Sequence, residues 1–145
     1  MQRVDGPDEV VELDVPWGPE PGAPMPRLWQ DEGTARLRYF AAPHQPVKIA
    51  VVEFTGCLQS QFGYPNEDAL PGHPLYERGL TFYGVFEVLR SSWLEELRRR
   101  NRLTHPHADW WPSGDCRHFI ITFHDSTFEC IAREMTGRLE DPPPT

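Results

Sequence analysis

Three side chains of this sequence could combine into an acid–base site: Glu53, His73 and His118. Glu53 ends a strongly apolar stretch, His73 lies in a long irregular segment, and His118 begins an alternating run. Burial of a carboxyl group raises its pKa toward the range of a useful general acid or base. Glu87 and Glu129 on other predicted strands could add carboxylates to the same pocket. The three residues are therefore candidate catalytic residues for a small-molecule substrate, although Glu53 could equally serve only to bond loop amides.

A metal site is a second possibility, and it requires three or four ligands that converge on one point. His118 and His124 face the same side of one predicted strand, but their separation along it is about 20 Å. They therefore cannot share an ion. A cluster of Cys116, His118 and a loop histidine, His105 or His107, has no characteristic spacing. We therefore expect no metal and no other cofactor.

Cys57 is a candidate nucleophile, because it follows Gly56 at a predicted strand end and His73 could activate it. No third residue that would orient the pair is identifiable, so a packed cysteine explains Cys57 better than a nucleophile does. The three cysteines lack paired spacing, which favours free thiols in a reducing compartment. With no basic leader and no apolar run of about 18 residues, we expect a cytoplasmic protein without membrane contact.

Several aromatic residues fall in two irregular segments, 56–79 and 104–116, rather than in strands. Tyrosine and tryptophan outside a core either fix a loop or line a binding surface, and both are common in interface hot spots. Long ordered loops in a small domain often carry function. The candidate residues for binding a protein partner or a small-molecule ligand are Tyr64, Asn66, Tyr76, Trp110 and Trp111.

The clearest element is a β-hairpin at 117–133, in which two alternating runs flank Asp125-Ser126. If these two residues form the turn, the apolar side chains gather on one face. This core face contains Phe119, Ile121, Phe123, Phe128 and Cys130. On the opposite, half-polar face, His118 is predicted to lie opposite Arg133.

One helix is well marked, at residues 92–102. Ser92 and Glu95 match a capping box, and the acids at its start and arginines at its end complement the helix dipole. The arginine cluster is therefore explained as a helix C-terminus rather than as a nucleic-acid site.

These elements, with further strand patterns at 36–42, 47–55 and 80–88, predict a single α+β domain. We expect a mostly antiparallel twisted sheet, or a partly closed barrel of about five strands, with helix 92–102 packed on it. The predicted division is an acidic tail rich in proline and glycine at 1–26, a globular domain at 27–138 and a C-terminal tail at 139–145.

The charge of the chain argues against nucleic acid as a partner. Residues 1–26 hold six acidic residues against one arginine, so this segment contributes −5 to the net charge of −8. A protein that binds nucleic acid neutralises phosphates with a basic surface, and no basic stripe is present in this sequence.

Two hypotheses of function follow. The first is a non-catalytic binding or interaction module that uses segments 56–79 and 104–116. The alternative is a small-molecule enzyme with an acid–base site of Glu53, His73 and His118. Residue patterns alone leave both hypotheses open, and they do not indicate an oligomeric state.

Overall fold

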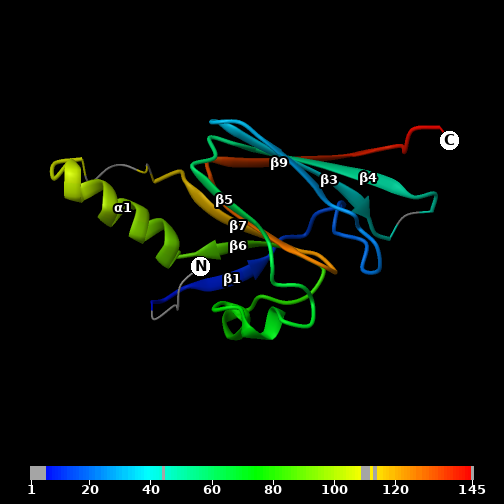
Figure 1. Cartoon of the computed structure of the whole chain (residues 1–145), viewed down its shortest axis with the longest axis horizontal. Coiled ribbons are helices and arrows are strands. Elements are labelled where there is room, and N and C mark those ends of the chain that lie inside the picture. The colour runs from blue at the N-terminus through cyan, green and yellow to red at the C-terminus, as the bar shows by residue number, and fades with distance from the viewer. Residues whose placement is uncertain (1–5, 44, 109–111, 113, 145) are drawn as a thin grey trace.

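Two antiparallel sheets face each other in the computed structural model, which describes residues 6–43, 45–108, 112 and 114–144 (Figure 1). Sheet A has five strands in the order β1-β6-β7-β8-β5, and sheet B has four in the order β2-β3-β4-β9. The strands are β1 (Glu9–Glu12), β2 (Arg27–Gln30), β3 (Thr34–Ala41), β4 (Lys48–Thr55), β5 (Gln59–Gly63), β6 (Val85–Leu89), β7 (Arg117–Thr122), β8 (Thr127–Ala132) and β9 (Glu134–Glu140). The helical elements are the 3-10 turns η1 (Leu70–Gly72) and η2 (Tyr76–Arg78) and the α-helix α1 (Ser92–Thr104).

The α+β class, the antiparallel pairing and one main helix are confirmed. The strands of the described residues form two open sheets rather than one sheet or a closed barrel. Ser91 caps α1, one residue before the predicted cap, and its side chain accepts a hydrogen bond from the Leu94 amide at 3.2 Å. Within the part of the chain that the structure describes, no helix is long and apolar enough to cross a membrane.

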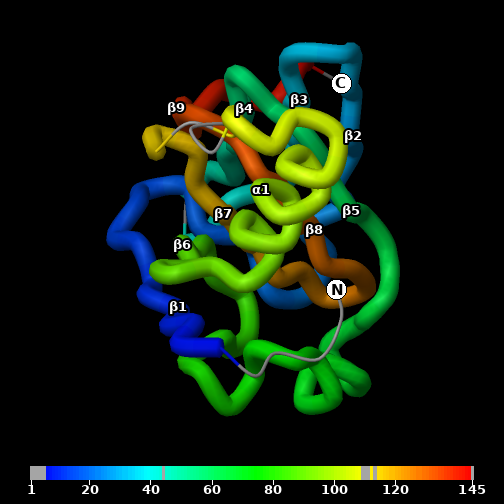
Figure 2. The backbone as a smooth tube through the Cα atoms, turned by 90° about the vertical axis from the view of Figure 1, so that its left-hand side faces the viewer, coloured from blue at the N-terminus to red at the C-terminus, as the bar shows by residue number. Residues whose placement is uncertain are grey.

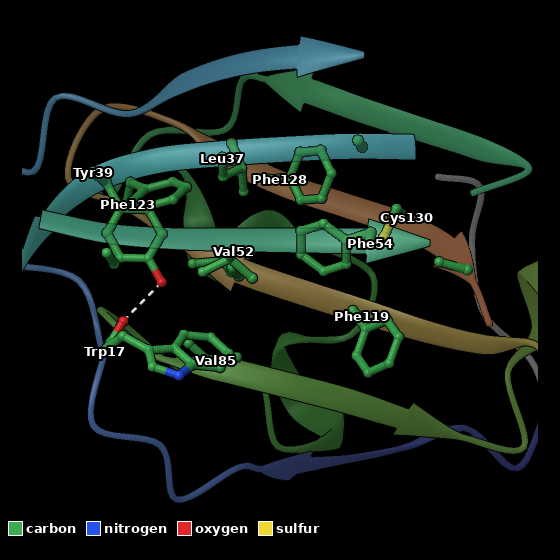
Figure 3. Packing of buried hydrophobic residues seen from close by; sticks show 14 of the residues in the cluster. Trp17, Leu37, Tyr39, Val52, Phe54, Val85, Phe119, Phe123, Phe128 and Cys130 are labelled. Atoms are coloured by element: carbon green, nitrogen blue, oxygen red, sulfur yellow. Dashed lines mark hydrogen bonds between the residues drawn. The ribbon is translucent and has the colours of Figure 1, made fainter. Parts of the chain in front are cut away.

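The main core lies between the sheets and is built from aromatic rings (Figure 3). The ring of Phe54 on β4 lies 5.1 Å from Phe128 on β8 and 5.8 Å from Phe119 on β7, measured between centroids. Toward the other end, Tyr39 meets Phe123 edge-on at 5.0 Å. Complete burial of each phenylalanine contributes roughly 1.5–3 kcal/mol before the entropic cost of ordering it.

The hairpin of β7 and β8 keeps the predicted core face but has a different register. Its loop has four residues, 123–126, and the Phe123 amide closes it by donating to the Ser126 carbonyl at 2.8 Å. A two-residue turn needs a positive φ at one or both central residues, and none of these four residues has one. The pairing therefore shifts by two, so His118 lies opposite Ile131. A shift by two leaves every side chain on its original face.

The N-terminal segment connects the two sheets. β1 pairs with β6 at the edge of sheet A, and Pro19 forms a bridge with Ala41 of β3 in sheet B. Residues 9–19, which lie inside the predicted tail 1–26, therefore contribute an edge strand and a link between the layers.

Trp17, between these two attachments, fills the core on the β9 side. It is 6% exposed, and its carbonyl accepts a hydrogen bond from the Tyr39 hydroxyl at 2.7 Å (Figure 3). The indole approaches Gly137 of β9 so closely that a Cβ at this glycine would come within 2.2 Å of the ring. Glycine is therefore required at this point of β9.

The outer face of sheet A is covered by two separate segments. Residues 70–80 cover one part of the face with Leu70 and Leu75, which cluster with Phe86 and Ile120. The other part is covered by α1, whose Leu94 and Leu97 lie against Ile131. In Figure 2, α1 lies in front of the strand ends, and the segment after β5 passes along one side and below the strands.

Candidate functional site

Four polar side chains form a continuous hydrogen-bonded series on the covered face of sheet A: Ser91, His118, Glu129 and His73, here called the polar chain. Ser91 Oγ lies 2.8 Å from His118 Nδ1, and His118 Nε2 lies 2.9 Å from Glu129 Oε1. The other carboxylate oxygen, Oε2, lies 2.7 Å from His73 Nε2. The polar chain thus joins the start of α1, strands β7 and β8, and the segment between η1 and η2.

Neighbouring backbone amides determine where the protons of the polar chain lie. The amide two residues after His73 donates to His73 Nδ1 at 3.0 Å, so His73 carries its proton on Nε2 and donates it to Glu129. The amide three residues after Ser91 donates to its Oγ, so the hydroxyl proton is free for His118 Nδ1. His118 then donates from Nε2 to Glu129. An ionised carboxylate between two neutral imidazoles therefore satisfies every group.

The polar chain is almost completely removed from solvent: His118 is 0% exposed, Glu129 4%, and His73 and Ser91 8% each. Burial by itself raises the pKa of Glu129. The hydrogen bonds from His118 and His73 outweigh burial and lower this pKa from 4.5 to about 2. Glu129 is therefore a buried anion whose charge depends on two histidine donors.

The hairpin register brings His118 and Glu129 together. His118 lies opposite Ile131, so Glu129 is its diagonal neighbour on the adjacent strand, within reach of a long side chain. Trp93 of α1 packs edge-on against the His118 ring, with 5.2 Å between centroids. The orientation of the imidazole is thus fixed by a hydrogen bond at each nitrogen and by contact with the Trp93 ring.

Two of the three predicted acid–base residues meet at Glu129, and the third lies elsewhere. Glu53 is on the outer face of sheet B, because its neighbours Val52 and Phe54 face the core. Its Oε1 accepts a hydrogen bond from Arg36 Nε at 3.0 Å. Glu129, which the sequence suggested only as an additional carboxylate, occupies the position between the histidines. Ser91 has no sequence signal beyond that of a helix cap.

A cavity of about 690 Å³ lies beside the Ser91 end of the polar chain. Ser91, His118 and Cys116 are among its lining residues. It is also lined by five arginines and three glutamates, and each arginine lies within ion-pair distance of a carboxylate. The arginines are Arg90, Arg98, Arg99, Arg102 and Arg117. Solvent-sized molecules can therefore approach Ser91 from this side.

The opposite end of sheet A exposes aromatic and acidic side chains. Tyr64, directly after β5, is 83% exposed. The loop that carries it is held against the hairpin, because Thr127 donates to the Pro65 carbonyl at 2.9 Å and the Glu67 amide donates to the His124 carbonyl at 2.9 Å. We call this surface the acidic end; it comprises Tyr64, Glu67, Asp68, Tyr83, His124 and Asp125.

Charges at the acidic end are mostly negative. The Glu67 carboxylate accepts a hydrogen bond from the Tyr83 hydroxyl. Its Oε1 lies 3.2 Å from His124 Nδ1, an ion-pair distance at which the angles do not make a hydrogen bond. Asp125 extends into solvent, with 91% of its side chain exposed.

The other residues predicted to bind a partner have different surroundings. Asn66 Oδ1 accepts from the Ala69 amide at 3.0 Å and so closes a turn. Tyr76 is half-buried, with its ring 6.1 Å from that of Phe82. Trp110 and Trp111 of segment 104–116 lie outside the described residues. Tyr64 is therefore the most open of the candidate binding residues that are described.

The structure also bears on the cysteine and metal alternatives. Cys57 is 3% exposed, and a hydrogen bond from Cys130 lowers the pKa of its thiol. Both ring nitrogens of His73 bond to other groups, so His73 does not activate this thiol. Among the described residues, no group of three or more histidines, cysteines and acids could hold a metal ion.

No protein-family model matches the chain, and neither a curated protein nor a solved structure matches it.

Proposed function

We propose that this protein is an interaction module that binds a basic segment of a partner protein at its acidic end. The observation that carries the proposal is Tyr64, which is 83% exposed on a loop anchored to the hairpin. An exposed tyrosine on an ordered loop offers a large contact area at little cost in conformational entropy. Rings of this kind are often the hot spots of protein interfaces.

Charge is the reason for expecting a basic partner. Glu67 and Asp125 lie 3.2 Å and 3.7 Å from the two ring nitrogens of His124, and the exposed Asp68 follows Glu67 in the chain. Glu20 is close enough for His124 to contribute to lowering its pKa, after the backbone hydrogen bonds that dominate the shift. A surface with this excess of carboxylates attracts lysine and arginine side chains and speeds their association. The chain as a whole carries a net charge of −8, which acts in the same direction.

Segment 104–116 stays a predicted second contact. Its described part folds back on α1, where the Pro112 carbonyl accepts from Arg98 at 3.1 Å. A partner that reached both segments would have to extend along sheet A, because segment 104–116 leads into the start of β7 whereas His124 and Asp125 follow its other end.

A second candidate function is small-molecule chemistry at the polar chain. The observation that favours it is the cavity beside Ser91 and His118. In this version His73 and His118 keep their predicted roles, and Glu129 replaces Glu53 as the carboxylate.

A peptide-display selection against the immobilised protein tests the binding proposal. We expect the selected peptides to be rich in lysine and arginine. The affinity of a synthetic selected peptide should fall at least about tenfold on Tyr64→Ala and on the pair Asp68→Lys and Asp125→Lys.

Matched controls lie elsewhere on the surface. Trp29→Ala removes another exposed ring, 52% exposed on β2, and Glu134→Lys reverses an exposed acid at the start of β9. Both should leave peptide affinity unchanged. The proposal is wrong if the selected peptides are not basic, or if they bind the acidic-end variants as tightly as the wild type.

A further inference from the structure

We propose that Ser91 is a nucleophile that cleaves carboxylic esters, with His118 as its general base and Glu129 as the residue that positions His118. This activity goes beyond the proposed binding function and belongs to the other end of the molecule. A hydroxyl, an imidazole and a carboxylate in series are recognised as a catalytic set by their geometry and roles, whatever their order in the chain.

The hydrogen bonds of the polar chain have the donors and acceptors that nucleophilic attack by Ser91 requires. Ser91 points its hydroxyl proton at His118 Nδ1, 2.8 Å away, and His118 holds its own proton toward Glu129 at 2.9 Å. His73 bonds the second oxygen of Glu129 and so prevents the carboxylate from rotating. A helix cap alone needs only the serine and a backbone amide, so capping does not explain the buried histidines and glutamate.

The reaction balances with the groups present and one water molecule. Ser91 Oγ forms a bond to the ester carbonyl carbon while its proton moves to His118 Nδ1, and Glu129 stabilises the resulting imidazolium. The bond to the leaving alkoxide breaks as that alkoxide takes the proton from His118. Water then attacks the acyl-serine, again giving its proton to His118. The carboxylic acid leaves, and the hydroxyl proton returns to Ser91.

The backbone presents Ser91 at the wall of the cavity. Strand β6 ends at Leu89, Arg90 has a positive φ of 54°, and Ser91 then caps α1. A positive φ is uncommon for arginine and marks a sharp turn between the strand and the helix. This turn directs the serine toward the cavity that His118 also lines.

A carboxylate of the chain itself stands close to where the reaction would build negative charge. The amide directly after the nucleophile, that of Ser92, is a natural donor to a tetrahedral oxyanion. It donates instead to Asp8 Oδ2 at 2.7 Å. Asp8 is 3% exposed and also accepts from the Ser92 hydroxyl. The N-terminal segment therefore holds the site in a restrained state, and removal of this carboxylate should release it.

The charged groups around the cavity are balanced. Its lining carries five arginines against three glutamates, but Arg90 pairs with Glu9 and the Asp8 carboxylate lies at Ser92, so the summed formal charge is zero. We therefore expect neutral esters to react at least as fast as esters of the same length that carry a second carboxylate.

The test uses the full chain with a fluorophosphonate probe, which bonds through phosphorus to a reactive serine and releases fluoride. Peptide mapping by mass spectrometry should find the adduct on Ser91. p-Nitrophenyl butyrate should be hydrolysed at least as fast as mono-p-nitrophenyl succinate. The rates of ester hydrolysis should fall by about 1,000-fold or more in His118→Asn. In Asp8→Ala they should rise by roughly tenfold to hundredfold, while the β1 control Glu12→Ala leaves them unchanged.

Ser91→Asn separates nucleophile from cap, because asparagine caps helices as well as serine does. The Ser91→Asn variant should keep the wild-type melting temperature but should not be labelled by the fluorophosphonate probe.

Glu129→Gln should move the midpoint of the pH–rate profile to lower pH, because the His118 imidazolium loses its counter-charge. A purely structural role of Glu129 predicts no such shift. A label that maps to Cys116 or to any residue other than Ser91, or no label on the folded wild-type chain, overturns the proposal.

Discussion

Glu129 and Glu53 occupy similar positions on opposite layers of the sandwich, yet their surroundings differ completely. Each lies on the outer face of a strand next to an edge strand, β8 in sheet A and β4 in sheet B. The Glu129 side chain is 6% exposed and bonds two histidines, whereas that of Glu53 is 28% exposed and pairs with Arg36.

The difference comes from what covers each face. Over sheet A lie α1 and residues 70–80, which bring His73 to the carboxylate and exclude water. In the part of the chain that the structure describes, the outer face of sheet B is covered only by side chains of its own strands. Val51 is only 1% exposed, and its cross-strand partners are Arg38 and Arg138, whose aliphatic stems can cover it.

The comparison shows that a glutamate on a strand becomes chemically distinctive through segments distant in the sequence. The strand pattern alone is the same in both cases. A covered carboxylate must find donors within the protein, and these donors then determine its pKa. An open carboxylate pairs with whichever cation lies beside it and exchanges with water.

The largest expected effect is on stability. Glu129→Ala should lower the free energy of unfolding by about 3–5 kcal/mol, because two buried histidine N–H groups lose their acceptor. Glu53→Ala should cost less than about 1 kcal/mol, since an exposed ion pair contributes little. Urea denaturation of both variants measures the difference. Equal losses would show that the cover over sheet A has no energetic consequence.

The stability that Glu129 contributes should depend on pH. The pKa of Glu129 is lowered from 4.5 to about 2, so its ionised form stabilises the fold fully above the ordinary pKa. This contribution, about 3 kcal/mol, disappears as the pH falls from about 4.5 toward 2. The stability advantage of wild type over Glu129→Gln should shrink by about 2 kcal/mol between pH 6 and pH 3. An advantage that is constant with pH would contradict a charged Glu129.

The smallest expected effect is the difference in salt dependence between variants of Glu53 and of Glu129. The loss of stability in Glu53→Gln should decrease further in 1 M NaCl, because the ion pair with Arg36 is partly exposed and is screened. The loss in Glu129→Gln should change much less, since ions do not reach the buried carboxylate. Parallel salt dependence in the two variants would place both carboxylates in the same environment.

The sequence predicted the parts of the fold that depend on local patterns. Alternation over residues 117–133 predicted the correct core face, and the capping and charge pattern predicted α1 to within a few residues. Strands β3 and β4 were expected within two residues of their observed bounds, whereas β6 begins at Val85, five residues after the predicted start at residue 80. Each of these elements buries its own regular pattern of apolar residues.

The parts that depend on tertiary packing were not predicted. Strand β9 has few apolar residues, because Trp17 supplies the core volume at Gly137. Strand β5 is an edge strand whose pattern resembles a loop. The pair of His118 and Glu129 requires the four-residue hairpin loop, and the predicted two-residue turn places Glu129 too far along the strand. His73 reaches the pair only because a loop folds back over the sheet.

The position of Trp17 has a consequence for the order of folding. Residues 9–17 leave the ribosome early, but their partners, β6 and the glycine on β9, are synthesised much later. Contacts this distant in sequence form slowly, because a long loop must close before they are gained. One side of the sandwich therefore closes only after β9 has been made. Until then the inner faces of β3 and β4 have no partner layer, and a nascent chain stalled at this stage should depend on chaperones.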